Sequence, residues 1–99
     1  MRDKSKIMII DDHPIFRKGL AQLINEEDDM AVCAEAETVF DAQKMIAKTR
    51  PDMLIVDISL KDASWLELVK YMRERNVKIP VLVLSMHEES EYAERAMKA

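Results

Sequence analysis

The sequence predicts an α/β fold, in which a parallel sheet is covered by helices. Short apolar runs rich in Ile and Val alternate with longer amphipathic stretches, the pattern of repeated strand and helix units. Aspartates follow two of these runs directly, as acids do at strand ends in wound sheets. The 99 residues, 48% hydrophobic and 34% charged, are typical of one soluble globular domain.

Four apolar runs are the candidate strands, namely Ile7–Ile10, Ala31–Ala34, Met53–Val56 and Val81–Leu84. The first and third runs are almost wholly apolar, which predicts central strands covered on both faces. Pro51 and Pro80 stand before the third and fourth runs, where a strand can begin after a proline.

Three stretches between the strands carry apolar residues at helical spacing, so each is expected to place an apolar stripe on the sheet. The stripes are Ile15, Phe16, Gly19, Leu20, Leu23 and Ile24; then Val39, Ala42, Met45 and Ile46; then Trp65, Leu68, Val69 and Met72. Pro14 suits a first helical turn, and Thr38 and Ser64 are candidate N-caps.

The order of the strands follows from their hydrophobicity and from the right-handed crossover rule. Placing the two central strands side by side gives the order 2-1-3-4, the flavodoxin-like, doubly wound arrangement. In that arrangement the winding reverses between the first and third strands, and ligands bind beyond the carboxyl ends of the strands at this point.

Composition excludes several classes of function. The formal net charge is −4 and no basic stripe is present, so the chain is not expected to contact DNA itself. The lone Cys33 cannot form an internal disulfide, and we interpret it as a small buried hydrophobic residue in a reducing cytoplasm. No apolar run is long enough for a signal peptide or a membrane span, so no membrane association is expected.

Three acids are predicted to share one small space at the reversal point. Asp11 and Asp12 follow the first strand and Asp57 follows the third. Clustered carboxylates repel one another and are costly to desolvate, so a hard divalent cation is the natural occupant. Mg²⁺ fits best, because it accepts a few carboxylates and keeps waters that phosphate oxygens can replace.

Ser85 follows the fourth strand and adds a hydroxyl donor at the same edge of the sheet. A carboxylate, a divalent cation and a hydroxyl are the parts needed to accept a phosphoryl group on Asp57. Ser59 could offer a backbone carbonyl to the cation. His13 is interpreted as a polar residue at a helix entry rather than a magnesium ligand, and His87 as a surface residue without a relay partner.

Three segments, "IIDDHPIFRKGLAQLI", "PDMLIVDISLKDASWLELVKYMR" and "IPVLVLSMHEESEYAERAMKA", resemble the receiver domain of two-component response regulators, of the NarL/FixJ type. The resemblance implies that Asp57 is the phosphoacceptor, that Asp12, Asp57 and the Ser59 carbonyl bind Mg²⁺ with Asp11 helping through water, and that Ser85 senses the phosphoryl group. It also implies a sensor histidine kinase as phosphodonor, self-association, and control of transcription through a separate DNA-binding domain. Tyr92 would be a contact residue of the signalling face.

Two departures from the family pattern stand out. Lys61, Asp62 and Trp65 occupy positions where the family commonly has Pro, Gly and Gly, and we interpret Trp65 as packing at a helix start. The family also continues past Ala99 with a fifth strand carrying a lysine and a fifth helix. We therefore expect residues 1–99 to be a truncated receiver domain that either belongs to a longer protein or exchanges elements with a second copy.

Other classes of function compete with a signalling switch that is not a metabolic enzyme. A magnesium-dependent phosphatase of related fold would carry a second acid two residues after its nucleophile, where this chain has Ser59. A nucleotide or flavin binder would want a glycine-rich loop, and the only glycine is Gly19. A pseudo-receiver, acting only as a protein-interaction module, is the alternative that remains.

Overall fold

The computed structural model describes residues 4–58 and 65–84. Strands and helices alternate along these residues, as the sequence predicts. In chain order they are β1 (Ser5–Ile10), α1 (Pro14–Asn25), β2 (Met30–Ala36), α2 (Val39–Thr49), β3 (Met53–Asp57), α3 (Trp65–Glu74) and β4 (Val81–Leu84). The first two strands are longer than the apolar runs that predict them, since β1 begins two residues earlier, at Ser5, and β2 extends from Met30 to Ala36.

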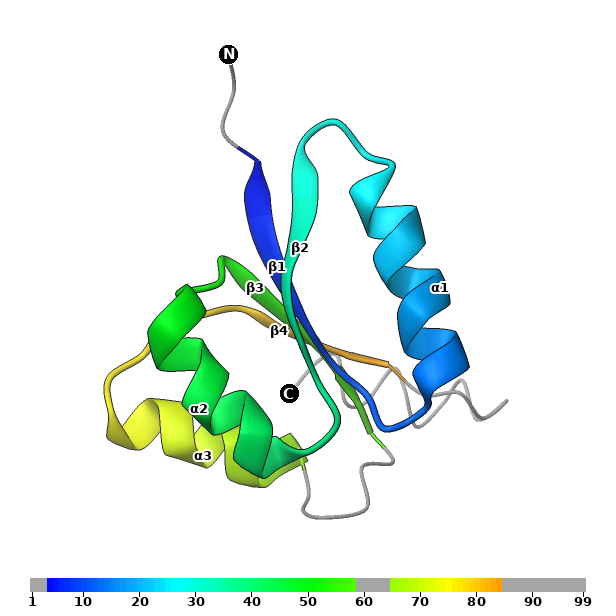
Figure 1. The fold of residues 1–99 in the computed structure, drawn as a ribbon. Helices are drawn as coiled ribbons and strands as arrows, with labels where there is room; N and C mark the ends of the chain where they lie inside the picture. The colour runs from blue at the N-terminus through cyan, green and yellow to red at the C-terminus, as the bar shows by residue number, and fades with distance from the viewer. Residues whose placement is uncertain (1–3, 59–64, 85–99) are drawn as a thin grey trace.

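The four strands form one parallel sheet in the order β2-β1-β3-β4. This confirms the predicted flavodoxin-like arrangement, with the reversal of winding between β1 and β3. Figure 1 shows α1 on one face of the sheet and α2 with α3 on the other. The carboxyl ends of β1 and β3 therefore lie next to each other, between the two layers of helices.

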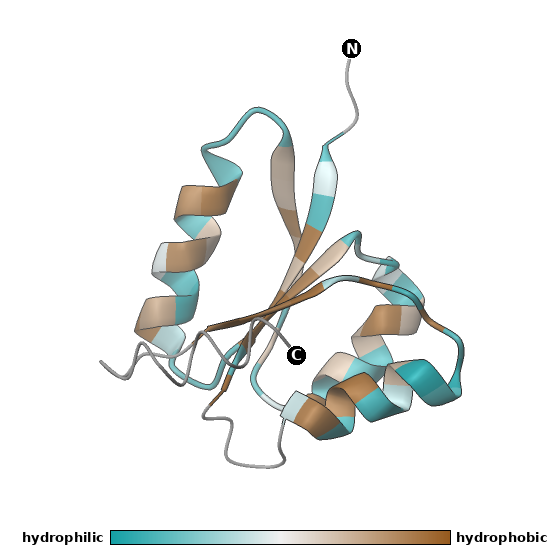
Figure 2. Cartoon of the chain, turned by 180° about the vertical axis from the view of Figure 1, so that it is seen from behind, coloured by the Kyte–Doolittle hydropathy of each residue, from teal (hydrophilic) through white to brown (hydrophobic). Residues whose placement is uncertain are grey.

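Central strand β1 supplies side chains to both faces, because successive residues of a strand point in opposite directions. Met8 and Ile10 pack in the core under α2 and α3, whereas Ile7 and Ile9 pack in the core under α1. All four are buried, and the brown sheet between the helices in Figure 2 shows this apolar layer. The prediction that β1 and β3 are covered on both faces is confirmed.

Helix α1 differs from the predicted stripe. Ile15 is 89% exposed and Leu23 is 64% exposed, although both were expected to face the sheet. Ala21 and Ile24 are the buried residues of this helix, and Arg17 lies on the same face. The edge of the apolar stripe that carries Ile15 and Leu23 therefore faces solvent.

Strand β2 contains a bulge at Cys33. Ile7 pairs with Val32 and Met8 pairs with Ala34, which leaves Cys33 as the extra residue. Cys33 is only half-buried, so its interpretation as a buried residue was wrong in degree. It packs against the core under α2 because the bulge turns it toward the same face as Ala34.

The helix starts follow the predicted signals where the structure describes them. Pro14 is the first residue of α1, and the Thr38 hydroxyl caps α2 by accepting a hydrogen bond from the Asp41 amide at 3.0 Å. The N-cap predicted at Ser64 lies outside the described residues. Of the helices in ranges 4–58 and 65–84, none is long and apolar enough to cross a membrane.

Candidate metal centre

Backbone hydrogen bonds fix the two strand ends that carry the acids. Ile10 pairs with Val56 in the register of β1 and β3, so Asp11 and Asp57 follow at neighbouring positions. The Asp11 amide donates to the Ala36 carbonyl at 2.9 Å, which extends the ladder between β1 and β2 by one residue. Both acids are buried, so the sheet itself holds two carboxylates in a desolvated place.

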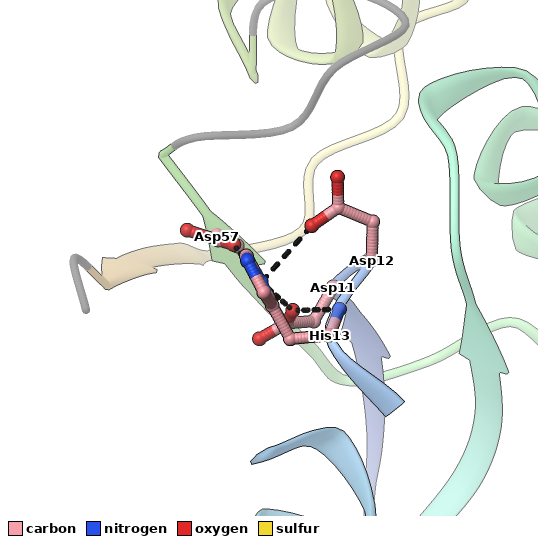
Figure 3. Close-up of side chains that lie close together, drawn as sticks. All are labelled: Asp11, Asp12, His13 and Asp57. Carbon is pink, nitrogen blue, oxygen red and sulfur yellow. Dashed lines mark hydrogen bonds and ion pairs between the residues drawn. The ribbon is translucent and has the colours of Figure 1, made fainter. Parts of the chain in front are cut away.

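The structure brings Asp11, Asp12 and Asp57 together as the sequence predicts. One ligand atom from each of these acids and one from His13 all lie within 4.8 Å of one another. Figure 3 shows the four side chains gathered where the chain leaves β1 and β3. The spacing permits a single cation to reach all three carboxylates.

His13 takes part in this cluster, which the sequence analysis did not predict. Its Nδ1 lies 3.0 Å from Asp11 Oδ1, 3.0 Å from Asp12 Oδ1 and 3.2 Å from Asp57 Oδ2. Its backbone amide donates to Asp11 Oδ1 at 2.7 Å, so the chain turns back on the first acid. The available signal was the two-residue spacing from Asp11, at which an aspartate accepts from the following backbone.

Electrostatics favour the protonated form of His13. The hydrogen bond to Asp11 is the main cause that raises the pKa of His13, and the charges of Asp12, Asp11 and Asp57 raise it further. Desolvation opposes these causes in part. The ring remains 42% exposed, so water still screens the pairs that it makes.

The surroundings of the Asp12 carboxylate indicate whether the cluster fits a metal ion. Both of its carboxylate oxygens are buried and lack a hydrogen-bond partner, and Oδ1 has only the ion pair with His13. A buried carboxylate that is not hydrogen-bonded is costly, because it has lost its water. Oxygens of this kind are the ligands that Mg²⁺ prefers, so the donor set fits that ion.

Trp65 resolves one departure from the family pattern. It is the first residue of α3 and packs half-buried against the core under α2 and α3. Among the described residues other than glycine, positive φ angles occur only at Arg50 and Asn76, so Trp65 carries no strain of that kind. The packing interpretation of Trp65 is confirmed.

The remaining predicted site residues cannot be placed. Ser59 and Ser85 lie outside the described residues, and so do Lys61, Asp62, His87 and Tyr92. The roles predicted for them stay predictions.

Comparison with known proteins gives one consistent result. The family model for the response regulator receiver domain matches residues 7–99. A nitrate/nitrite response regulator protein homolog from Haemophilus influenzae is 33% identical over 89% of this chain and 42% of its own length. The transcriptional regulatory protein DegU of Brevibacillus brevis is 31% identical over 97% of this chain and 41% of its own.

Solved structures similar to this chain are also response regulators. A LuxR-family two-component response regulator from Aurantimonas matches with a TM-score of 0.83 and 31% identity, over 97% of this chain and 69% of that one. A LuxR-family DNA-binding response regulator from Staphylococcus aureus matches with a TM-score of 0.79 and 26% identity, over 95% and 78%. The chain thus spans about two-fifths of the curated relatives named here and more of the solved chains.

Proposed function

This chain belongs to the receiver-domain family of two-component response regulators, and from that membership we propose that Asp57 accepts a phosphoryl group in a reaction that depends on Mg²⁺. Response regulators are signalling proteins and not classical enzymes. The phosphodonor proposed here is a sensor histidine kinase, acting in the cytoplasm.

The convergence of three carboxylates on one place is the observation that carries this proposal. Asp11 and Asp57 are buried at adjacent strand ends, and Asp12 adds two buried oxygens without hydrogen bonds. A fold gains no stability from such a cluster, because like charges repel and buried charges are costly. The cluster is therefore better explained by binding of a divalent cation and transfer of a phosphoryl group than by a role in folding.

Asp57 is the proposed nucleophile. One carboxylate oxygen of Asp57 attacks the phosphorus of the donor, and the bond between phosphorus and the donor nitrogen breaks as the new bond to oxygen forms. The electron pair of the broken bond leaves with the imidazole of the kinase. Because β3 holds Asp57 by its register with both neighbours, the attacking oxygen needs little reorientation.

The residues that would hold Mg²⁺ are Asp11, Asp12, Asp57 and the Ser59 carbonyl, with Asp11 acting through water. The ion would neutralise charge on the phosphoryl oxygens during transfer. Ser85 is proposed to donate its hydroxyl to the phosphoryl group. These roles for Ser59 and Ser85 follow from family membership, since neither residue is among those described.

We propose that phosphorylation controls self-association and the output of a DNA-binding domain. The relatives named above include a transcriptional regulatory protein, and this chain spans 41% of its length. Residues 1–99 would then be a truncated receiver domain of a longer regulator. A pseudo-receiver without phosphorylation is less favoured, because the convergence of three carboxylates supports a phosphoacceptor site.

Mass spectrometry of the intact chain tests the proposal. With Mg²⁺ and acetyl phosphate, we expect a single added phosphoryl mass. This mass should not appear in Asp57→Asn, or when the metal is chelated before the donor is added. Asp28→Asn is the matched control, because Asp28 is exposed in the turn before β2, at the opposite end of the strands. An adduct that persists in Asp57→Asn, or no adduct in the full-length regulator, would contradict the proposal.

A further inference from the structure

Arg17 joins three parts of the molecule beside the acidic cluster. One guanidinium nitrogen donates to the Asp11 carbonyl oxygen at 2.7 Å. Nε donates to Glu35 Oε1 at 3.0 Å, and the other terminal nitrogen lies 3.5 Å from Glu37 Oε1. The Arg17 side chain is only 11% exposed, whereas arginine side chains are mostly exposed unless they are paired.

The contact with the Asp11 carbonyl bears directly on the metal centre. That carbonyl belongs to the peptide group that links Asp11 to Asp12, and a peptide group is planar. The Asp11 amide is already held by the Ala36 carbonyl on β2. With Arg17 holding the carbonyl, the orientation of the link between the two acids is fixed, and with it the direction in which the Asp12 side chain leaves the chain.

The two glutamates hold Arg17 in place in turn. Glu35 is in β2 and Glu37 follows that strand, so the guanidinium is anchored to the sheet and not only to its own helix. A planar guanidinium can donate in several fixed directions at once, whereas a lysine amine offers one point of charge. The sequence alone gave no sign of this, because Glu35 is 18 positions from Arg17.

We propose that Arg17 is a positioning residue of the metal centre, which holds the peptide between Asp11 and Asp12 so that both carboxylates face Asp57. The inference rests on the proposed function, because it concerns the binding of Mg²⁺ at that site. Partners that orient metal ligands typically account for about 10- to 100-fold in metal affinity.

The sign of the effect separates positioning from simple electrostatics. Arg17 is a cation near a site that binds a cation, so its charge alone weakens Mg²⁺ binding. Removing that charge without any change of geometry would strengthen binding. A loss of affinity on removal of Arg17 therefore reports orientation of the acids and not charge.

Calorimetric titration of Mg²⁺ into the chain, at one pH and ionic strength, tests this. Arg17→Gln is expected to weaken binding about 10-fold. Lys18→Gln removes the same charge from the exposed neighbouring position and is expected to leave binding unchanged or slightly stronger. Replacing both Glu35 and Glu37 by Gln keeps the donor to the Asp11 carbonyl, and a loss of affinity smaller than that of Arg17→Gln is expected.

The outcomes distinguish failure of the proposed Mg²⁺ site from failure of the proposed role of Arg17. If the unsubstituted chain binds no Mg²⁺, the proposed function fails and this inference fails with it. If it binds Mg²⁺ and Arg17→Gln binds as tightly or more tightly, only the inference is overturned. Should circular dichroism show that Arg17→Gln does not fold, Arg17→Lys replaces it, with an expected loss of a few-fold; affinity equal to the unsubstituted chain would then overturn the inference.

Discussion

Two hollows of the molecule differ sharply in size and in chemistry. A groove of about 690 Å³ lies between α3 and β4, and its walls are mostly apolar, with Trp65, Val69 and Val83 among them. The hollow beside Asp11 and Asp57, on the α1 side of the sheet, has essentially no room for a water molecule. Two acids of the proposed metal centre, Asp11 and Asp57, nevertheless line the smaller hollow, whereas no acid lines the groove.

The contrast shows that the larger hollow is not the one where acidic ligands gather. The described residues that line the groove include Arg73 and Lys78 but no carboxylate, so the groove has no converging set of ligands. At the acidic cluster, three carboxylates lie close together, although their mutual repulsion opposes folding. Buried residues beneath α3 should therefore affect stability and exposed residues at the rim of the groove should not, whereas those of the cluster should affect ligand binding.

The largest expected effect is a loss of stability on the groove side. Leu68 is fully buried in the core beneath α3, so Leu68→Ala should cost about 3 kcal/mol in the free energy of unfolding. The affinity of the folded protein for Mg²⁺ should be unchanged. Urea unfolding measures the stability and calorimetric titration measures the Mg²⁺ affinity. A clear loss of affinity in the folded variant would contradict the separation of stability from metal binding.

Asp12→Asn should do the reverse. Loss of this ligand is expected to weaken Mg²⁺ binding about 100-fold, or about 2.7 kcal/mol. Stability without metal should not fall, because the substitution removes one of three clustered charges, and the oxygens of Asp12 itself lack hydrogen bonds. A variant that is much less stable in chelator, measured by urea unfolding, would show that the cluster serves the fold.

The dependence on pH should be smaller, because His13 is partly exposed. The pKa of His13 is raised in the folded chain, so its ion pairs stabilise fully below the unfolded value near 6.5 and are lost as pH rises through the higher folded pKa. NMR titration of the two histidines, assigned with His13→Gln, should show a pKa above 6.5 for His13. Saturation with Mg²⁺ should lower it, and an unchanged value would place the ion elsewhere.

The smallest effect is expected at the rim of the groove. Leu66 is exposed and lines the groove, so Leu66→Gln should change the free energy of unfolding by no more than about 0.5 kcal/mol. Mg²⁺ affinity should be unchanged. A substantial loss of stability, measured by urea unfolding, would show that this rim is part of the core and not of the surface.

Local patterns predicted most of the fold. The apolar runs of β1 and β3 identify central strands, and Thr38 marks a helix start by its own side chain. The stripe on α1 was predicted less well, because spacing alone does not say which edge of a wide stripe meets the sheet. Ala21 is buried there while Ile15 is not, a choice that depends on where α1 lies over β1 and β2.

The sequence by itself determined the order of strands and the presence of acids at two strand ends, because residue type and spacing fix both. Only the tertiary structure decided that His13 Nδ1 lies within reach of all three carboxylates and that Arg17 holds the peptide between two of them. The reason is physical: such contacts depend on strand register, helix rotation and one tight turn together, and no single stretch of sequence encodes their sum.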